Sequence, residues 1–158
     1  MSTYIGIDPG LSGAIAFLRY KSVIAIHPMP LRMYSASKEE PDSKALYELL
    51  RAYGKVECIG IEQVGAVKGS SASSAFTFGR AFQAVLAAVE ISGLPHVRIQ
   101  PKEWKKSILV GTDQSKEAAI GFVKRMYPGV DLIPPGESKD SHDFAEAICL
   151  AKYAQKVK

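Results

Sequence analysis

The chain has 158 residues, of which 47% are hydrophobic and 23% are charged, and its formal net charge at neutral pH is +4. These values are ordinary for a globular protein and exclude both a collagen-like chain and a strongly charged disordered one. No apolar run approaches the roughly 20 residues that a helix needs to span a bilayer, and the first residues lack the layout of a secretion signal. We therefore expect a single domain over residues 1–158 in the cytoplasm.

The first stretch of interest is residues 4–13, which read YIGIDPGLSG. Its apolar run predicts a strand, and this strand ends on Asp8 just before Pro9-Gly10. A carboxylate that ends a buried strand lies at the rim of the sheet, where water and ligands reach it. Taken alone, the same residues are equally typical of an Asp-Pro-Gly turn.

Two more short strands follow at residues 14–20 and 23–27, which predicts an antiparallel meander. Residues 28–42 contain three prolines and predict a surface loop, and residues 43–52 have helical spacing of leucines. The strand at residues 56–62 follows this helix, so we expect it to pair in parallel with the first strand. Its last residue, Glu62, would then lie beside Asp8.

The next segments carry most of the positive charge. Residues 67–158 hold thirteen basic and nine acidic side chains, whereas residues 1–66 hold seven of each. Small residues at 64–74 predict a linker or a mobile loop, and a helix follows at residues 74–91, with a buried face of Phe78, Phe82, Val85, Leu86 and Val89. A short strand at 96–99 then leads to a basic segment from Pro101, and a further helix is predicted at 114–126. The excess of basic residues suits a partner that is a polyanion, although similar imbalances occur on inert surfaces.

Two side chains near the C-terminus complete a set of acids. Residues 139–153 predict a helix, and Asp140 and Asp143 are three residues apart in it, so both can point the same way from its first turn. Acids are also favoured at helix N-termini for reasons of capping and dipole alone. Four carboxylates on rigid elements suit Mg²⁺, and two such ions activate water in phosphodiester hydrolysis. The two cysteines, Cys58 and Cys149, lie in apolar runs and predict reduced core residues.

Three motifs in this order resemble the RuvC-type Holliday junction resolvases of the RNase H-like (retroviral integrase) superfamily: IGIDPGLSG, IGIEQV and DSHDFAEAICLA. The segments QPKEWKK and SKEAA are most similar to the phage-borne branch. The resemblance covers nearly the whole chain. It departs from the family at Gly65, where cellular members often carry an aromatic residue that opens the junction.

The resemblance implies an α/β fold with a five-stranded mixed sheet in the order 3-2-1-4-5 and helices on both faces. It also implies a homodimer that cuts four-way or other branched DNA with Mg²⁺ or Mn²⁺, two ions per active site, in a bacterial or phage-infected cell. Asp8, Glu62, Asp140 and Asp143 would hold the metal ions. Lys105 and Lys116 would match the family's basic residues near the scissile phosphate, and Lys116 would act in catalysis with the acids. The expected DNA contacts are Lys68, Arg80, Lys102, Lys105, Lys106 and Lys116.

Three other functions fit parts of the pattern. An ATPase domain of the actin and sugar kinase type also opens with a strand ending in Asp-x-Gly, but it needs two such domains and a second phosphate loop. A non-catalytic scaffold that binds junctions would have no need for four acids. A ribonuclease that acts on RNA–DNA hybrids shares the expected fold. The favoured interpretation is a structure-selective, metal-dependent DNA endonuclease, that is, a crossover junction endodeoxyribonuclease.

Overall fold

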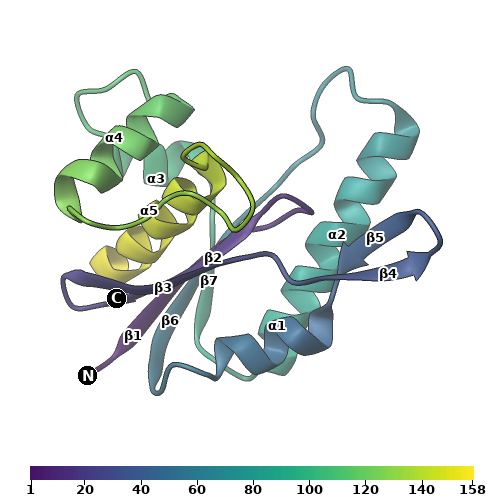
Figure 1. Ribbon diagram of the computed structural model, residues 1–158, viewed down its shortest axis with the longest axis horizontal. Helices are drawn as coiled ribbons and strands as arrows, with labels where there is room; N and C mark the ends of the chain where they lie inside the picture. Colours follow the sequence, from purple (N-terminus) through teal and green to yellow (C-terminus); the bar gives the residue numbers. More distant parts are fainter.

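A five-stranded mixed sheet forms the centre of the protein in a computed structural model that describes residues 1–158 (Figure 1). Its strands lie in the order β3-β2-β1-β6-β7. They span β1 (Thr3–Asp8), β2 (Ala14–Arg19), β3 (Ser22–Pro28), β6 (Val56–Glu62) and β7 (His96–Ile99). Strands β1, β2 and β3 are antiparallel neighbours, whereas β6 is parallel to β1 and β7 is parallel to β6. The predicted fold class and strand order are confirmed.

Helices cover both faces of this sheet. On one face lie α1 (Ser43–Leu50) and α2 (Ala72–Ile91), and on the other lie α3 (Pro101–Ile108), α4 (Lys116–Met126) and α5 (His142–Val157) (Figure 1). Each face has its own hydrophobic core, and alternate residues of the strands contribute to each. No helix combines the length and the apolar character that crossing a membrane requires. Both cysteines are buried and unpaired, as predicted.

Helix α5 lies directly on β1. Ile5 and Ile7 point into the core beneath α1 and α2, whereas Gly6 faces α5. A Cβ atom on Gly6 would lie 1.9 Å from the carbonyl oxygen of Ala147 and 2.3 Å from the backbone nitrogen of Ala151. The absence of a side chain at Gly6 therefore lets the backbone of α5 approach the backbone of the sheet.

The connector at residues 28–42 differs from the prediction. Instead of an irregular loop it forms a hairpin of β4 (Leu31–Ser35) and β5 (Lys38–Pro41), which lies beside α2 (Figure 1). Pro28 and Pro30 precede β4 and Pro41 ends β5, so the prolines flank the strands without interrupting them. Both strands are largely exposed, which explains why they lack the alternating hydrophobic pattern of a strand.

Two helices also begin or pack differently from the prediction. Helix α5 starts at His142 with Ser141 as its N-cap, three residues later than expected, because the Ser141 hydroxyl accepts the N–H of Phe144. In α2 the buried face is confined to Ala81 and later residues. The prediction that Phe78 belongs to this buried face was wrong, since its side chain is 37% exposed.

Candidate metal centre

Two of the predicted acids lie at one edge of the sheet because β1 and β6 run side by side. In the parallel pairing Ile7 lies opposite Ile61, so the next residue of each strand is an acid, Asp8 in β1 and Glu62 in β6. Beyond Asp8 the chain turns through Gly10, whose φ of 132° is a backbone conformation that favours glycine. The turn leads into β2 and keeps Asp8 at the rim of the sheet.

Helix α5 brings two further acids to the same edge. Asp143 lies in its first turn and Glu146 one turn later, on the side that faces the sheet. Carboxylate oxygens of Asp8, Asp143 and Glu146 lie within 4.8 Å of one another. We call Asp8, Glu62, Asp143 and Glu146 the acidic cluster, since Glu62 lines the same cavity as the other three.

The acidic cluster is electrostatically costly without a cation. Asp8 is 8% exposed, and this burial, together with the negative charges of Glu146, Glu62 and Asp143, raises its pKa well above the usual value of 3.8. Burial likewise raises the pKa of Glu146, although the nearby Lys105 opposes this increase. Hard oxygen ligands in this number fit Mg²⁺ or Mn²⁺, and a bound cation would offset the repulsion among them.

The cavity over the acidic cluster has a volume of about 570 Å³. The turn after β1 and the exposed half of α2 form its opposite wall, with Pro9, Leu11, Ser74, Thr77 and Phe78 among the lining residues. Lys116, the first residue of α4, also lines it. The Nζ of Lys116 is 2.9 Å from Nε2 of His142, and this Nε2 is 3.2 Å from Oδ1 of Asp143. The cavity therefore has a cation at one side of its carboxylates.

Helix α3 contacts two members of the acidic cluster. The Trp104 indole donates a hydrogen bond of 2.8 Å from Nε1 to Oε1 of Glu62. The neighbouring Lys105 places Nζ 3.7 Å from Oε1 of Glu146, and its side chain is only 28% exposed. Lys105 therefore pairs with a buried acid in this structure.

Asp140 lies apart from the other predicted acids. Because α5 begins at His142, Asp140 precedes the helix, and the expectation that Asp140 and Asp143 share its first turn was wrong. The carboxylate of Asp140 forms an ion pair with Lys124 of α4. Asp140 does not line the cavity, and Glu146 lies within the acidic cluster instead.

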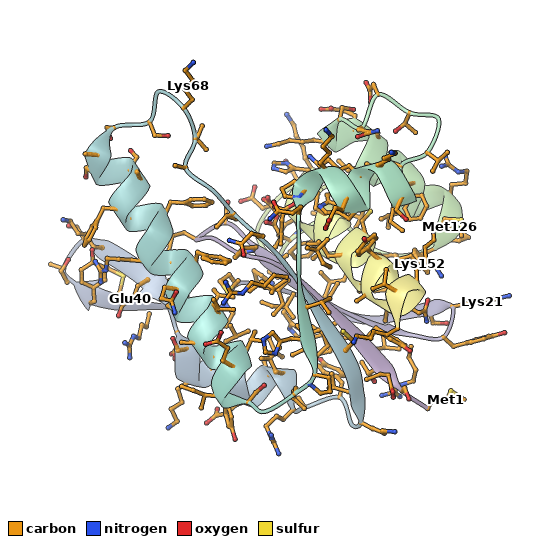
Figure 2. All side chains as sticks on the ribbon, turned by 180° about the vertical axis from the view of Figure 1, so that it is seen from behind. Met1, Lys21, Glu40, Lys68, Met126 and Lys152 are labelled. Carbon is orange, nitrogen blue, oxygen red and sulfur yellow. The ribbon has the colours of Figure 1, made fainter.

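The remaining predicted DNA contacts differ in their availability. Lys102 and Lys106 are exposed on α3. Lys68 is exposed in the loop between β6 and α2, and Figure 2 shows its side chain pointing away from the body of the protein. Arg80 forms an ion pair with Glu40 of the hairpin, with 3.0 Å between NH2 and Oε2, and lies over the rings of Tyr34 and Phe76. Arg80 is thus already engaged within the protein.

Sequence reasoning missed three residues of this centre: Trp104, His142 and Glu146. Glu146 had a usable signal, because it is an acid inside the otherwise apolar run FAEAICLA, and such an acid is rarely buried without a partner. Trp104 lies in the basic segment that begins at Pro101, where the pattern of the sequence gives it no role in the site. Its contact with Glu62 joins residues 42 positions apart, and no local pattern reports such a contact.

Comparisons with known proteins relate the chain to one family. No protein-family model matches it. The crossover junction endodeoxyribonuclease RuvC of Alkalilimnicola ehrlichii is 33% identical over 106 residues, which are 67% of this chain and 61% of that relative. The chain thus aligns with somewhat less than two thirds of the length of this relative.

Solved structures share the fold. The structure of T. thermophilus RuvC in complex with a Holliday junction substrate matches 100% of this chain and 98% of its own, with a TM-score of 0.64 and 20% identity. Another Thermus thermophilus RuvC structure matches 94% of this chain and 90% of its own, with a TM-score of 0.53 and 20% identity. The chain is therefore similar to RuvC in sequence over 106 residues and shares the fold of the Thermus RuvC structures, in agreement with the resemblance noted from the three motifs.

Proposed function

We propose that this protein is a metal-dependent endonuclease that hydrolyses phosphodiester bonds in branched DNA, above all in the four-way Holliday junction. One observation carries the proposal: carboxylates from β1 and α5 converge to within 4.8 Å at a sheet edge, in a fold shared with RuvC. The relative from A. ehrlichii is named for this activity, and one Thermus structure contains a junction substrate. We also infer that residues 1–158 act as one nuclease domain, since both cores share one sheet.

The acidic cluster is the proposed binding site for two ions of Mg²⁺ or Mn²⁺. Asp8, Glu62 and Asp143 would be ligands, and the geometry favours Glu146 as the fourth carboxylate, whereas Asp140 stays a prediction from the resemblance. Bound divalent ions would lower the pKa of a water molecule and stabilise the leaving oxygen. The buried position of Asp8 holds its carboxylate in place, and few waters compete with it for a cation.

Basic residues around the cavity have a separate role in this proposal. Lys116 would neutralise charge that develops on the scissile phosphate, because it lines the cavity beside Asp143. Lys102 and Lys106 are free to contact the DNA backbone at a distance from the cut. Such contacts increase affinity for any DNA and provide no selection of sequence.

A homodimer is part of the proposal because a four-way junction presents two equivalent strands to cut. A two-fold interface would set two identical sites against them. The exposed half of α2, residues 72–80, supports this idea, since it projects beyond the sheet with Phe76 68% exposed. Sedimentation is expected to show a dimer at micromolar concentration, and only monomer with and without DNA would contradict it.

A cleavage assay tests the proposed activity directly. Labelled four-way junction, flap, RNA–DNA hybrid and linear duplex are incubated with the protein, with and without Mg²⁺. We expect Mg²⁺-dependent cutting of the junction before the other substrates. Glu62→Gln should retain junction binding and lose cleavage, because it keeps the shape of the side chain and removes its charge. Equal cutting of the hybrid, or cleavage at the wild-type rate in Glu62→Gln, would contradict the proposal.

A further inference from the structure

The only tryptophan of the chain, Trp104, is fully buried, and its one polar atom contacts an acid of the proposed metal centre. Its Nε1–H donates to Oε1 of Glu62 at 2.8 Å, which is the geometry of a good hydrogen bond. An indole N–H is only a donor, and burying it without a partner is costly. The fold therefore has to place an acceptor at this point, and the acceptor is a carboxylate that also lines the cavity.

The neighbouring strand fixes this contact. Glu62 ends β6 opposite Ile99 of β7, and the backbone N–H of Gln63 donates to the carbonyl of Ile99 at 2.8 Å. Helix α3 begins two residues after Ile99, with Pro101 in its first turn and a capping box between Gln100 and Glu103. Trp104 then packs into the core formed with α4 and α5. The position of the indole relative to Glu62 is thus set by the connection of α3 to β7 and by the packing of Trp104 against α4 and α5.

We propose that Trp104 is a positioning residue that fixes the carboxylate of Glu62 for binding a divalent cation. The hydrogen bond occupies one carboxylate oxygen and restricts rotation of the group, while the other oxygen remains available. Partners of this kind commonly change metal affinity by 10–100-fold when they are removed, as an order of magnitude. The inference rests on the proposed metal-dependent function, and it assigns Trp104 a role beyond filling the core.

Trp104→Phe tests this role because it keeps an aromatic ring in the core and removes only the N–H donor and part of the volume. Binding of Mn²⁺ is measured through the electron paramagnetic resonance signal of the free ion, so no cleavage is needed. We expect the affinity to fall by about tenfold or more. Leu109→Ala is the matched control, because Leu109 is buried in the same core at the end of α3 and touches no acid through a polar atom. It should lower the unfolding temperature and leave the affinity within about twofold.

A double-mutant cycle separates positioning from general loosening of the site. If Trp104 acts through Glu62, Trp104→Phe should have little further effect on Mn²⁺ affinity in a Glu62→Gln background, so the two effects are not additive. Full additivity, or wild-type affinity in folded Trp104→Phe, would overturn the positioning role and leave the metal centre intact. Absence of any Mn²⁺ binding to the wild-type protein would overturn both proposals.

The wild-type protein supplies a second measurement that does not depend on the folding of Trp104→Phe. Trp104 is the sole source of tryptophan fluorescence, and Mg²⁺ does not itself quench that fluorescence. We expect saturating Mg²⁺ to shift the emission with the same midpoint as the binding curve, and Glu62→Gln to abolish the shift. Emission that stays constant while Mg²⁺ saturates the site would overturn the proposal.

Discussion

Helices α5 and α2 cover opposite faces of the same sheet, yet they differ in how much of each is buried. Nine of the sixteen residues of α5 are buried, along almost its whole length. In α2 five of twenty are buried, and all of them lie at Ala81 or later in the helix. Acids on α5 are therefore held in fixed positions relative to Asp8, which suits ligands that have to be preorganised. The first half of α2 contributes mainly exposed side chains and suits contacts with another molecule.

The largest expected effect comes from removing the negative charge of Asp8, the buried acid beside α5. Asp8→Asn should lower junction cleavage by about a thousandfold or more, as for loss of a group that stabilises the transition state. The same change should raise stability without metal by roughly 0.5–2 kcal/mol, because it removes repulsion among buried carboxylates. Single-turnover cleavage and chemical unfolding measure the two effects. Cleavage within tenfold of wild type would remove Asp8 from the centre.

Substitutions of two glycines test the difference in packing directly. Gly6→Ala places a methyl group against the backbone of α5, which cannot move aside as a flexible side chain can, so stability should fall by about 3 kcal/mol. Gly79→Ala is the matched change in α2, where the new Cβ would meet no atom within 4 Å apart from the nearby backbone of α2 itself. It should be neutral or stabilise by up to about 1 kcal/mol, because alanine favours helix. Equal changes in unfolding temperature for the two variants would show that α5 and α2 do not differ in how closely they are packed.

Glu146 and Asp140 sharpen the assignment of the acids around α5. If Glu146 is the fourth carboxylate, Glu146→Gln should slow cleavage by about 10–100-fold and weaken Mn²⁺ binding to a similar extent. Asp140→Asn breaks an exposed ion pair with Lys124 and should change either quantity by less than Glu146→Gln does. The opposite order would favour the assignment implied by the three motifs. Both variants are compared at the same Mg²⁺ concentration.

The sequence predicted what depends on local pattern. The strands ending in Asp8 and Glu62 were recognisable because each is an apolar run closed by an acid, and the parallel pairing followed from the intervening helix. Whether Asp140 or Glu146 belongs to the acidic cluster depends on where α5 begins. With Ser141 as its N-cap, α5 begins three residues later than the sequence pattern predicted. The contact between Trp104 and Glu62 depends on the pairing of β6 with β7, which is set by the whole sheet.

The pH dependence of stability should reflect the same buried acids. A carboxyl group whose pKa is higher in the folded than in the unfolded protein adds stability that is fully present below the unfolded pKa. This stability is lost as the pH rises through the folded pKa. Because the pKa values of Asp8 and Glu146 are raised, the metal-free protein should become less stable as the pH rises from about 4. The slope should be smaller in Asp8→Asn and with saturating Mg²⁺. Identical slopes for wild type and Asp8→Asn in urea unfolding would contradict this.

The smallest effect is expected from the exposed lysines of α3, which lie at the surface beside the buried site. If Lys102 and Lys106 contact phosphates, each contact releases counterions and adds about 0.9 to the slope of log affinity against log salt concentration. The double variant Lys102→Ala, Lys106→Ala should therefore weaken junction binding and lower that slope by almost two, with little change in single-turnover cleavage of bound DNA.

The variant Lys44→Ala, Lys55→Ala is the matched control. It removes the same charge from exposed positions outside α3 and should leave the slope nearly constant. Lys116→Ala should instead slow cleavage and change the slope less, because Lys116 lies in the cavity with Asp143. Equal salt slopes for all these variants would show that the lysines of α3 do not contact the DNA backbone.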